Sequence, residues 1–174
     1  MPVPLLLEFT PAAADLPPGV DLRTILVDIA ADRVSAPADV TPQLERVVKQ
    51  ARDHGIDLSI VVVGQNPPME GDLRDLASAV GATQQGTVLV LSPDTVGTFS
   101  DTLARVRLEQ AEDPAKYQHG ATVHQAQAFV DTLTAPPAPD WTALTITLVA
   151  GTAAAAGGLY LFKSRRARRA APTA

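Results

Sequence analysis

No residue from Thr142 to Phe162 carries a charge. At the helical rise of about 1.5 Å per residue, this stretch is about 30 Å long, which is the thickness of the hydrocarbon core of a bilayer. Trp141 precedes it and basic residues follow it, as at the two interfaces of a membrane helix. The sequence therefore predicts a transmembrane helix over 141–162, with these residues at the membrane interfaces: Trp141, Lys163, Arg165 and Arg166.

Small residues recur four apart inside the same segment. Ala153 is followed by Gly157, and Ala154 by Gly158. This spacing lets two helix backbones approach closely, so it is compatible with self-association of the segment. Stretches rich in Ala and Gly also contain such pairs by chance, and a segment that stays single in the bilayer is the alternative.

Charge is divided unevenly along the chain. All 19 acidic residues lie at or before Asp140, whereas five Lys and Arg residues follow Phe162. An acidic domain is a poor partner for nucleic acid. The basic cluster predicts that the tail, residues 163–174, is cytoplasmic and that the N-terminal domain lies outside the cytoplasm. Residues 1–15 lack a basic n-region, so the 141–162 segment would have to act as a reverse signal; the opposite orientation is the alternative.

The first half of the chain alternates helical and strand patterns. Residues 1–20, rich in proline, predict an extended N-terminal arm. Apolar residues at helical spacing predict one helix from Asp21 and a second from Thr41 to Gly55. The apolar runs Leu58–Val63 and 88–91 predict two buried strands, joined by a helix over 73–80. We expect these strands to be parallel and linked by a right-handed crossover.

The second half is less regular. The polar loop after Leu91 passes into a predicted strand at 96–99, and the alternation of Val106 and Leu108 with charged residues predicts a half-exposed strand at 104–109. Thr122 and Gln125 have the spacing of a capping box, so a last helix follows them. Prolines at 135–140 predict a stiff linker. The predicted layout is an arm (1–20), an α/β domain (21–134), a linker (135–140), a transmembrane helix (141–162) and a tail (163–174).

Few residues suggest chemistry. The sequence has no nucleophile motif, no phosphate-binding glycine loop and no Cys or His spacing for a metal, and without cysteine it has no disulfides. His54 fits a helix C-terminus, and His119 and His124 are wrongly spaced for one helix face. Oxygen-rich side chains follow two neighbouring strands, where ligands of α/β sheets collect. Weak candidates for a Ca²⁺ or Mg²⁺ site, which ordinary turns also explain, are Glu70, Asp72, Asp94 and Asp101.

The region from Leu44 to Leu91, with its order of helix, strand, helix and strand, resembles a TPM domain. A narrower resemblance is to an actinobacterial family of small, single-pass, TPM-like membrane proteins. It is carried by Gly55-Ile56-Asp57-Leu58, Asn66-Pro67-Pro68, Leu73-Arg74-Asp75, Val88-Leu89-Val90-Leu91-Ser92-Pro93, Val96-Gly97-Thr98 and Trp141-Thr142-Ala143-Leu144-Thr145-Ile146. The resemblance implies a small α/β/α domain with a short mixed sheet, and regulation of the peptidoglycan endopeptidases of cell separation by protein contact outside the membrane.

Two classes of function follow. The first is a non-enzymatic, membrane-anchored regulator or scaffold without a cofactor, which contacts its partner protein through Asn66, Pro67, Pro68, Met69, Ser92, Asp94, Thr98 and Phe99. The second is a metal-dependent phosphatase or ligand-binding domain of the TPM type. The acidic metal-binding pattern and the glycine-rich return segment of TPM domains are not evident in this sequence, so the first class is preferred.

Overall fold

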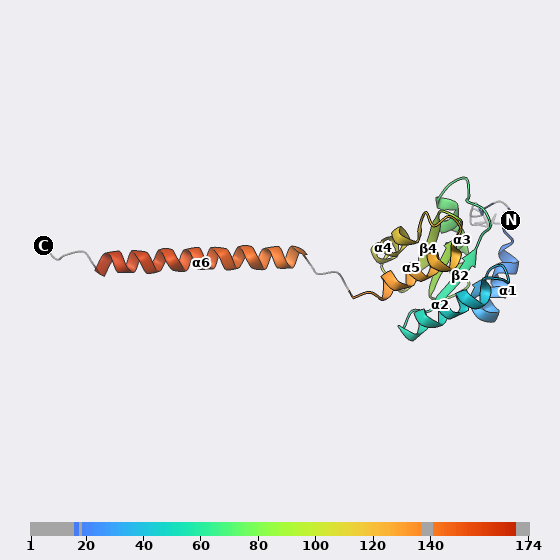
Figure 1. Cartoon of the computed structure of the whole chain (residues 1–174), viewed down its shortest axis with the longest axis horizontal. Helices are drawn as coiled ribbons and strands as arrows, with labels where there is room; N and C mark the ends of the chain where they lie inside the picture. Colours follow the sequence, from blue (N-terminus) through green and yellow to red (C-terminus); the bar gives the residue numbers. More distant parts are fainter. Residues whose placement is uncertain (1–15, 18, 137–140, 170–174) are drawn as a thin grey trace, which may run out of the picture. The chain divides into compact units, whose positions relative to one another are not determined.

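The computed structural model describes residues 16–17, 19–136 and 141–169 (Figure 1). Contacts divide the chain into two units, Met1–Ala135 and Pro136–Ala174, and each is described by itself. Most of the predicted N-terminal arm, residues 137–140 of the predicted linker and residues 170–174 of the predicted tail lie outside the described residues.

The first unit is built on a four-stranded sheet in the order β1-β2-β3-β4. The strands are β1 (Val34–Ser35), β2 (Leu58–Val62), β3 (Thr87–Leu91) and β4 (Val96–Ser100). The first three are parallel, and β4 runs antiparallel to β3. The two predicted buried strands, their parallel pairing and the strand near 96–99 are therefore confirmed. The two-residue β1 was not predicted, because so short a strand leaves no periodic signal.

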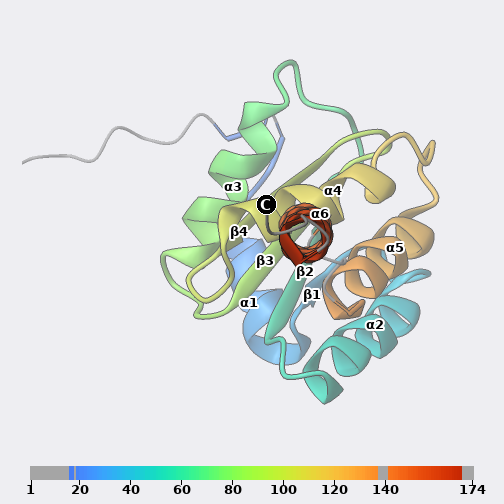
Figure 2. The ribbon, with the colours of Figure 1, turned by 90° about the vertical axis from the view of Figure 1, so that its left-hand side faces the viewer.

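Helices cover both faces of this sheet, which confirms the small α/β domain with a mixed sheet (Figure 2). On one face, Ile60, Leu89 and Leu91 pack against α2 (Thr41–Asp53), α4 (Arg105–Ala115) and α5 (Thr122–Thr134). On the other face, Val61, Val88 and Val90 pack against α1 (Leu22–Asp32) and α3 (Gly71–Gly81). Alternate residues of one strand feed both cores, which explains why these strands are apolar throughout.

The two helical crossovers have opposite hands. The helix α2 joins β1 to β2 on one face of the sheet, whereas α3 joins β2 to β3 on the other. Across the sheet the strands lie in the order β1, β2, β3, so two right-handed crossovers would place both helices on the same face. Since α2 and α3 lie on opposite faces, one of the two connections is left-handed, which is rare among parallel strands. As a result, the chain leaves β1 and β2 toward opposite faces of the sheet.

The predicted strand at 104–109 is wrong, because these residues lead into and form the first part of α4. Leu108, Ala111 and Ala115 lie buried at helical spacing, whereas Val106 points into solvent. The alternation of Val106 and Leu108 was thus a coincidence, and the small alanines of the buried helical face were given too little weight.

The predicted capping box at the start of α5 is also wrong. Ala121 occupies the N-cap position without a side-chain hydrogen bond. The side chain of Gln125 is fully buried, and its Nε2 donates to the carbonyl of Ser92 at 2.9 Å. Gln125 therefore makes a tertiary contact with the loop after β3 and does not take part in a helix cap. The threonine at the start of α2 is likewise not its cap. The N-cap is Val40, and the Thr41 hydroxyl donates to Pro37 O instead.

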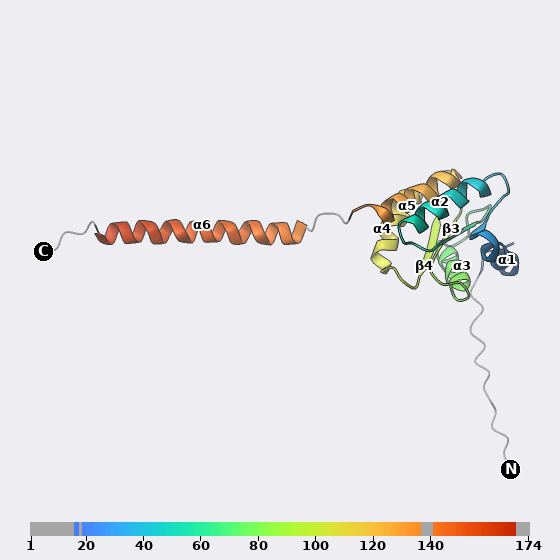
Figure 3. The same ribbon diagram turned by 90° about the horizontal axis from the view of Figure 1, so that it is seen from below.

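The second unit contains one helix, α6 (Trp141–Arg169), seen from below with the rest of the chain in Figure 3. Within the part of the chain that the structure describes, no helix combines the length and the apolar character needed to cross a membrane. The predicted transmembrane helix over 141–162 is therefore wrong. Its length was sufficient, but threonines, glycines and alanines dilute the leucines over most of the segment.

Candidate functional site

Three loops meet at the carboxyl end of the parallel strands, and we call them the three-loop surface. They are residues 63–70 after β2, 92–95 between β3 and β4, and 116–121 between α4 and α5. The first two are joined through Asn66. Its Nδ2 donates to Asp94 Oδ2 at 2.7 Å, and its Oδ1 accepts from the Asp94 N–H at 2.9 Å. The prediction that these two loops lie side by side is confirmed.

Ser92 holds the second loop in place from its buried side. This residue is almost fully buried, and its hydroxyl donates to Asn66 Oδ1 at 2.9 Å and contacts the hydroxyl of Thr95 at 2.7 Å. Gln125 fixes the Ser92 carbonyl from the α5 side. Buried polar groups with several partners of this kind fix one geometry, so the loop is held in a single conformation.

The sequence did not predict that the third loop belongs to this surface. In the structure, hydrogen bonds and an ion pair join it to the other two loops. The N–H of Tyr117 donates to Asp94 O at 2.9 Å, and the N–H of Gly120 donates to Pro93 O at 2.8 Å. Lys116 forms an ion pair of 2.6 Å with Glu70. The sequence offered one signal for this loop, the break in apolar periodicity between Ala115 and Thr122.

The backbone of the third loop holds two non-glycine residues in the left-handed region. Tyr117 has a φ of 57° and His119 a φ of 49°. Each such conformation costs about 1 to 3 kcal/mol, which the surrounding hydrogen bonds must offset. In this conformation the aromatic side chain of Tyr117 is 72% exposed. Met69 on the first loop is 64% exposed.

In the described part of the chain, the surface has one ion pair between two charged groups, Lys116 with Glu70. Asp94 Oδ1 lies 3.1 Å from Nδ1 of His119, which is highly exposed. The hydrogen bond from Lys116 to Glu70 raises the pKa of Lys116 above its ordinary value, against the opposing effect of desolvation. A surface with exposed apolar tips, on which Glu70 is paired with a lysine, suits contact with another protein better than attraction of a small ion.

This pKa shift gives a pH-dependent prediction. A lysine whose folded-state pKa is raised stabilises the fold fully below the ordinary value of 10.5, and that contribution is lost as pH rises through the raised pKa. We expect Lys116→Met to lower the free energy of unfolding by about 1 kcal/mol at neutral pH. In urea titrations, the gap to the wild-type chain should close at strongly alkaline pH. A gap that stays constant would assign the loss to packing of the lysine stem.

The candidate metal ligands are engaged with protein groups. Glu70 pairs with Lys116, and Asp72 Oδ2 accepts from the Met69 N–H at 3.3 Å. Both oxygens of Asp101 accept from the Gly86 N–H at 3.2 Å, at the opposite end of β4 from Asp94. The expectation that Asp101 lies beside Asp94 is wrong, because β4 is antiparallel. Among the described residues, no three His, Cys, Asp or Glu side chains are grouped so that they could hold a metal ion.

The remaining predicted contact residues divide into two groups. Pro67 and Pro68 belong to the first loop of the three-loop surface, beside Met69. Thr98 is buried and its hydroxyl donates to Glu112. Phe99 packs against the core formed with α1 and α3 and fills the space over Gly81. Thr98 and Phe99 thus lie in β4 and contribute to packing between the sheet and its helices.

Comparison with known proteins places the chain in a family. No solved structure matches it. The family model described as "Membrane protein Rv1476" matches residues 15–173. The protein "Membrane protein Rv1476" of Mycobacterium tuberculosis (strain ATCC 25618 / H37Rv) is 47% identical over 159 residues, which cover 91% of this chain and 84% of that protein. With nearly the whole chain matched in both comparisons, this protein belongs to the membrane protein Rv1476 family.

Proposed function

We propose that this chain is a membrane-associated, non-enzymatic regulator or scaffold whose α/β domain binds a partner protein through the three-loop surface. One observation carries the proposal. Tyr117 and Met69 are exposed on neighbouring loops that hydrogen bonds and an ion pair hold in place. Exposed aromatic and methionine side chains on a preorganised surface are typical of protein interfaces, because little side-chain or loop entropy is lost on binding.

The class of partner follows from two further lines of support. The family is described as a membrane protein family. The resemblance to TPM-like proteins of actinobacteria favours a peptidoglycan endopeptidase of cell separation as the partner. Such an enzyme acts outside the cytoplasmic membrane, so the proposal puts the α/β domain on that side. The five positive charges of residues 163–169 favour contact of the second unit with anionic lipid.

Alanine at either exposed side chain should weaken capture of the endopeptidase. We expect Tyr117→Ala or Met69→Ala to raise the Kd at least about tenfold, because central aromatic and apolar anchors dominate binding energy. The measurement is surface capture of the purified endopeptidase by the full chain in detergent. Both variants should keep the thermal transition of the wild-type chain, since exposed side chains contribute little to stability.

A matched control is Val106→Ala. Val106 is 59% exposed and apolar, but it lies on α4, outside the three loops. This variant should bind like the wild-type chain. Equal losses for Tyr117, Met69 and Val106 would indicate non-specific adsorption. Unchanged binding by both loop variants would show that the partner uses another surface.

A further inference from the structure

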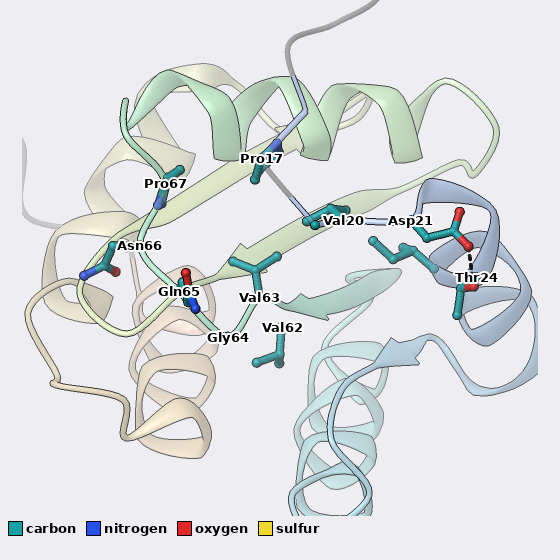
Figure 4. A pocket seen from close by; sticks show the side chains of 12 residues that line it. Pro17, Val20, Asp21, Thr24, Val62, Val63, Gly64, Gln65, Asn66 and Pro67 are labelled. Atoms are coloured by element: carbon teal, nitrogen blue, oxygen red, sulfur yellow. Dashed lines mark hydrogen bonds between the residues drawn. The ribbon is translucent and has the colours of Figure 1, made fainter.

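A groove of about 540 Å³ lies outside the carboxyl end of β2, between the start of α1 and the loop that follows β2. Figure 4 shows Val62, Val63 and Gln65 between Asp21 and Thr24 on one side and Asn66 and Pro67 on the other. In open α/β sheets this is the place where ligands bind. Its volume is also within the range of small-molecule and peptide sites.

The backbone at the groove offers a donor, the N–H of Gly64, just beyond the end of β1. The N–H of Ile60 donates to Arg33 O on the β1 side, whereas the N–H of Val63 donates to Leu91 O on β3. Gly64 lies in a bend just after β2, and the alternation along the strand would direct its N–H to the β1 side. The last residue of β1 pairs with Val61, so β1 ends before it reaches Gly64. Within the described residues, no acceptor contacts the Gly64 N–H.

The side chains define the chemistry of an occupant. Val20 and Ile25, together with Val62 and Val63, give the groove apolar walls. None of the described residues that line it is Lys, Arg or His. At the rim, Asp21 accepts from Thr24 Oγ1 at 2.8 Å and from the Arg23 N–H at 3.0 Å. These bonds, that from Thr24 first, lower the pKa of Asp21. The start of α1 is thus already capped by a carboxylate, which disfavours a phosphate group there.

We propose that this groove binds an extended basic peptide segment of another protein, placed as a short strand beside the end of β2. A carbonyl of the peptide accepts from the N–H of Gly64, apolar side chains of the peptide enter the groove, and a basic side chain meets Asp21. This mode is β-strand addition, in which the main chain supplies affinity and pockets supply selectivity. The site goes beyond the three-loop surface, with which it shares the loop from Val63 to Pro67.

The test follows amide resonances of the ¹⁵N-labelled full chain in detergent during titration with acetyl-Val-Lys-Val-Lys-amide. We expect saturable shifts at Val20, Val62 and Gly64, and a Kd at least about tenfold weaker for acetyl-Val-Glu-Val-Glu-amide. Gly64→Leu should abolish the shifts at Val20 and Val62. Its new side chain meets no atom within 4 Å at Cβ and Gly64 has no positive φ, so the fold is retained while the groove is filled.

Gly71→Leu is the matched control, because Gly71 also has open space at Cβ but does not line the groove. This variant should bind the lysine peptide like the wild-type chain. Absence of shifts with millimolar peptide, or equal binding by Gly64→Leu, would overturn the proposal. A chain without residues 2–15 should bind with unchanged Kd. Binding by that shortened chain alone would make the protein's own N-terminal segment the occupant, and the proposal would be wrong.

Discussion

Replacing Gly97 with alanine should lower the free energy of unfolding of the α/β domain by about 3 kcal/mol, at the upper end of the usual cost of overpacking a core. An added Cβ would lie 2.4 Å from the carbonyl carbon of Leu73 and 2.6 Å from the backbone nitrogen of Arg74. Both contacts are backbone atoms of α3, so no side chain can turn away. The helix would have to move off β4, and the core between them would lose its packing.

Urea denaturation of the full chain, followed by the far-ultraviolet circular dichroism of the domain, measures this loss. Gly71→Ala is the control, because its Cβ would meet no atom within 4 Å and its φ is not positive. We expect this control to unfold within about 0.5 kcal/mol of the wild-type chain. An equal midpoint for Gly97→Ala would mean that α3 does not press against β4.

Removing the positive charge of Arg105 should be the second large effect. The Nη2 of Arg105 lies 3.3 Å from Oε1 of Glu112, whose side chain is only 6% exposed. Its Nη1 also donates to the carbonyl and the hydroxyl of Thr98, at 3.3 and 3.2 Å. Arg105→Met would leave a buried carboxylate with only the hydroxyl of Thr98 as a partner. Leaving a buried carboxylate without its cation is destabilising, and because the Arg105 side chain is itself 37% exposed we expect a loss of about 2 kcal/mol, below the cost for a fully buried pair.

The double variant Arg105→Met with Glu112→Leu separates the charge from packing. It should recover most of the loss, since an apolar pair replaces the uncompensated carboxylate. Glu109→Gln breaks the exposed ion pair of Arg105 with Glu109 and should cost less than about 1 kcal/mol. A double variant less stable than Arg105→Met alone would contradict this reading and assign the loss to the arginine stem.

The sequence was informative where structure is local. Continuous apolar runs predicted β2 and β3, because both faces of these strands are covered, and start and stop residues predicted α2 closely. It failed for α4, where buried alanines carry the helical face and one exposed valine imitates a strand. It failed for the segment 141–162 because length and lack of charge were weighed above its diluted hydropathy.

The candidate site was predictable only in part, for a related reason. Polar residues after neighbouring strands meet at one edge of a sheet, so Asn66 and Asp94 were expected to be close, and they are bonded. The loop at 116–121 reaches that edge only because α4 and α5 pack together on one face. Such long-range contacts, like the antiparallel turn that carries Asp101 away, leave no periodic trace in the sequence.

Site-specific photocrosslinking in the native host would show whether the three-loop surface captures a protein partner. A photoreactive phenylalanine analogue would replace Tyr117 in the full chain and, as the control, Val106. We expect a light-dependent adduct with a peptidoglycan endopeptidase from position 117 and none from position 106. Adducts of equal yield from both positions, or from position 106 alone, would contradict it.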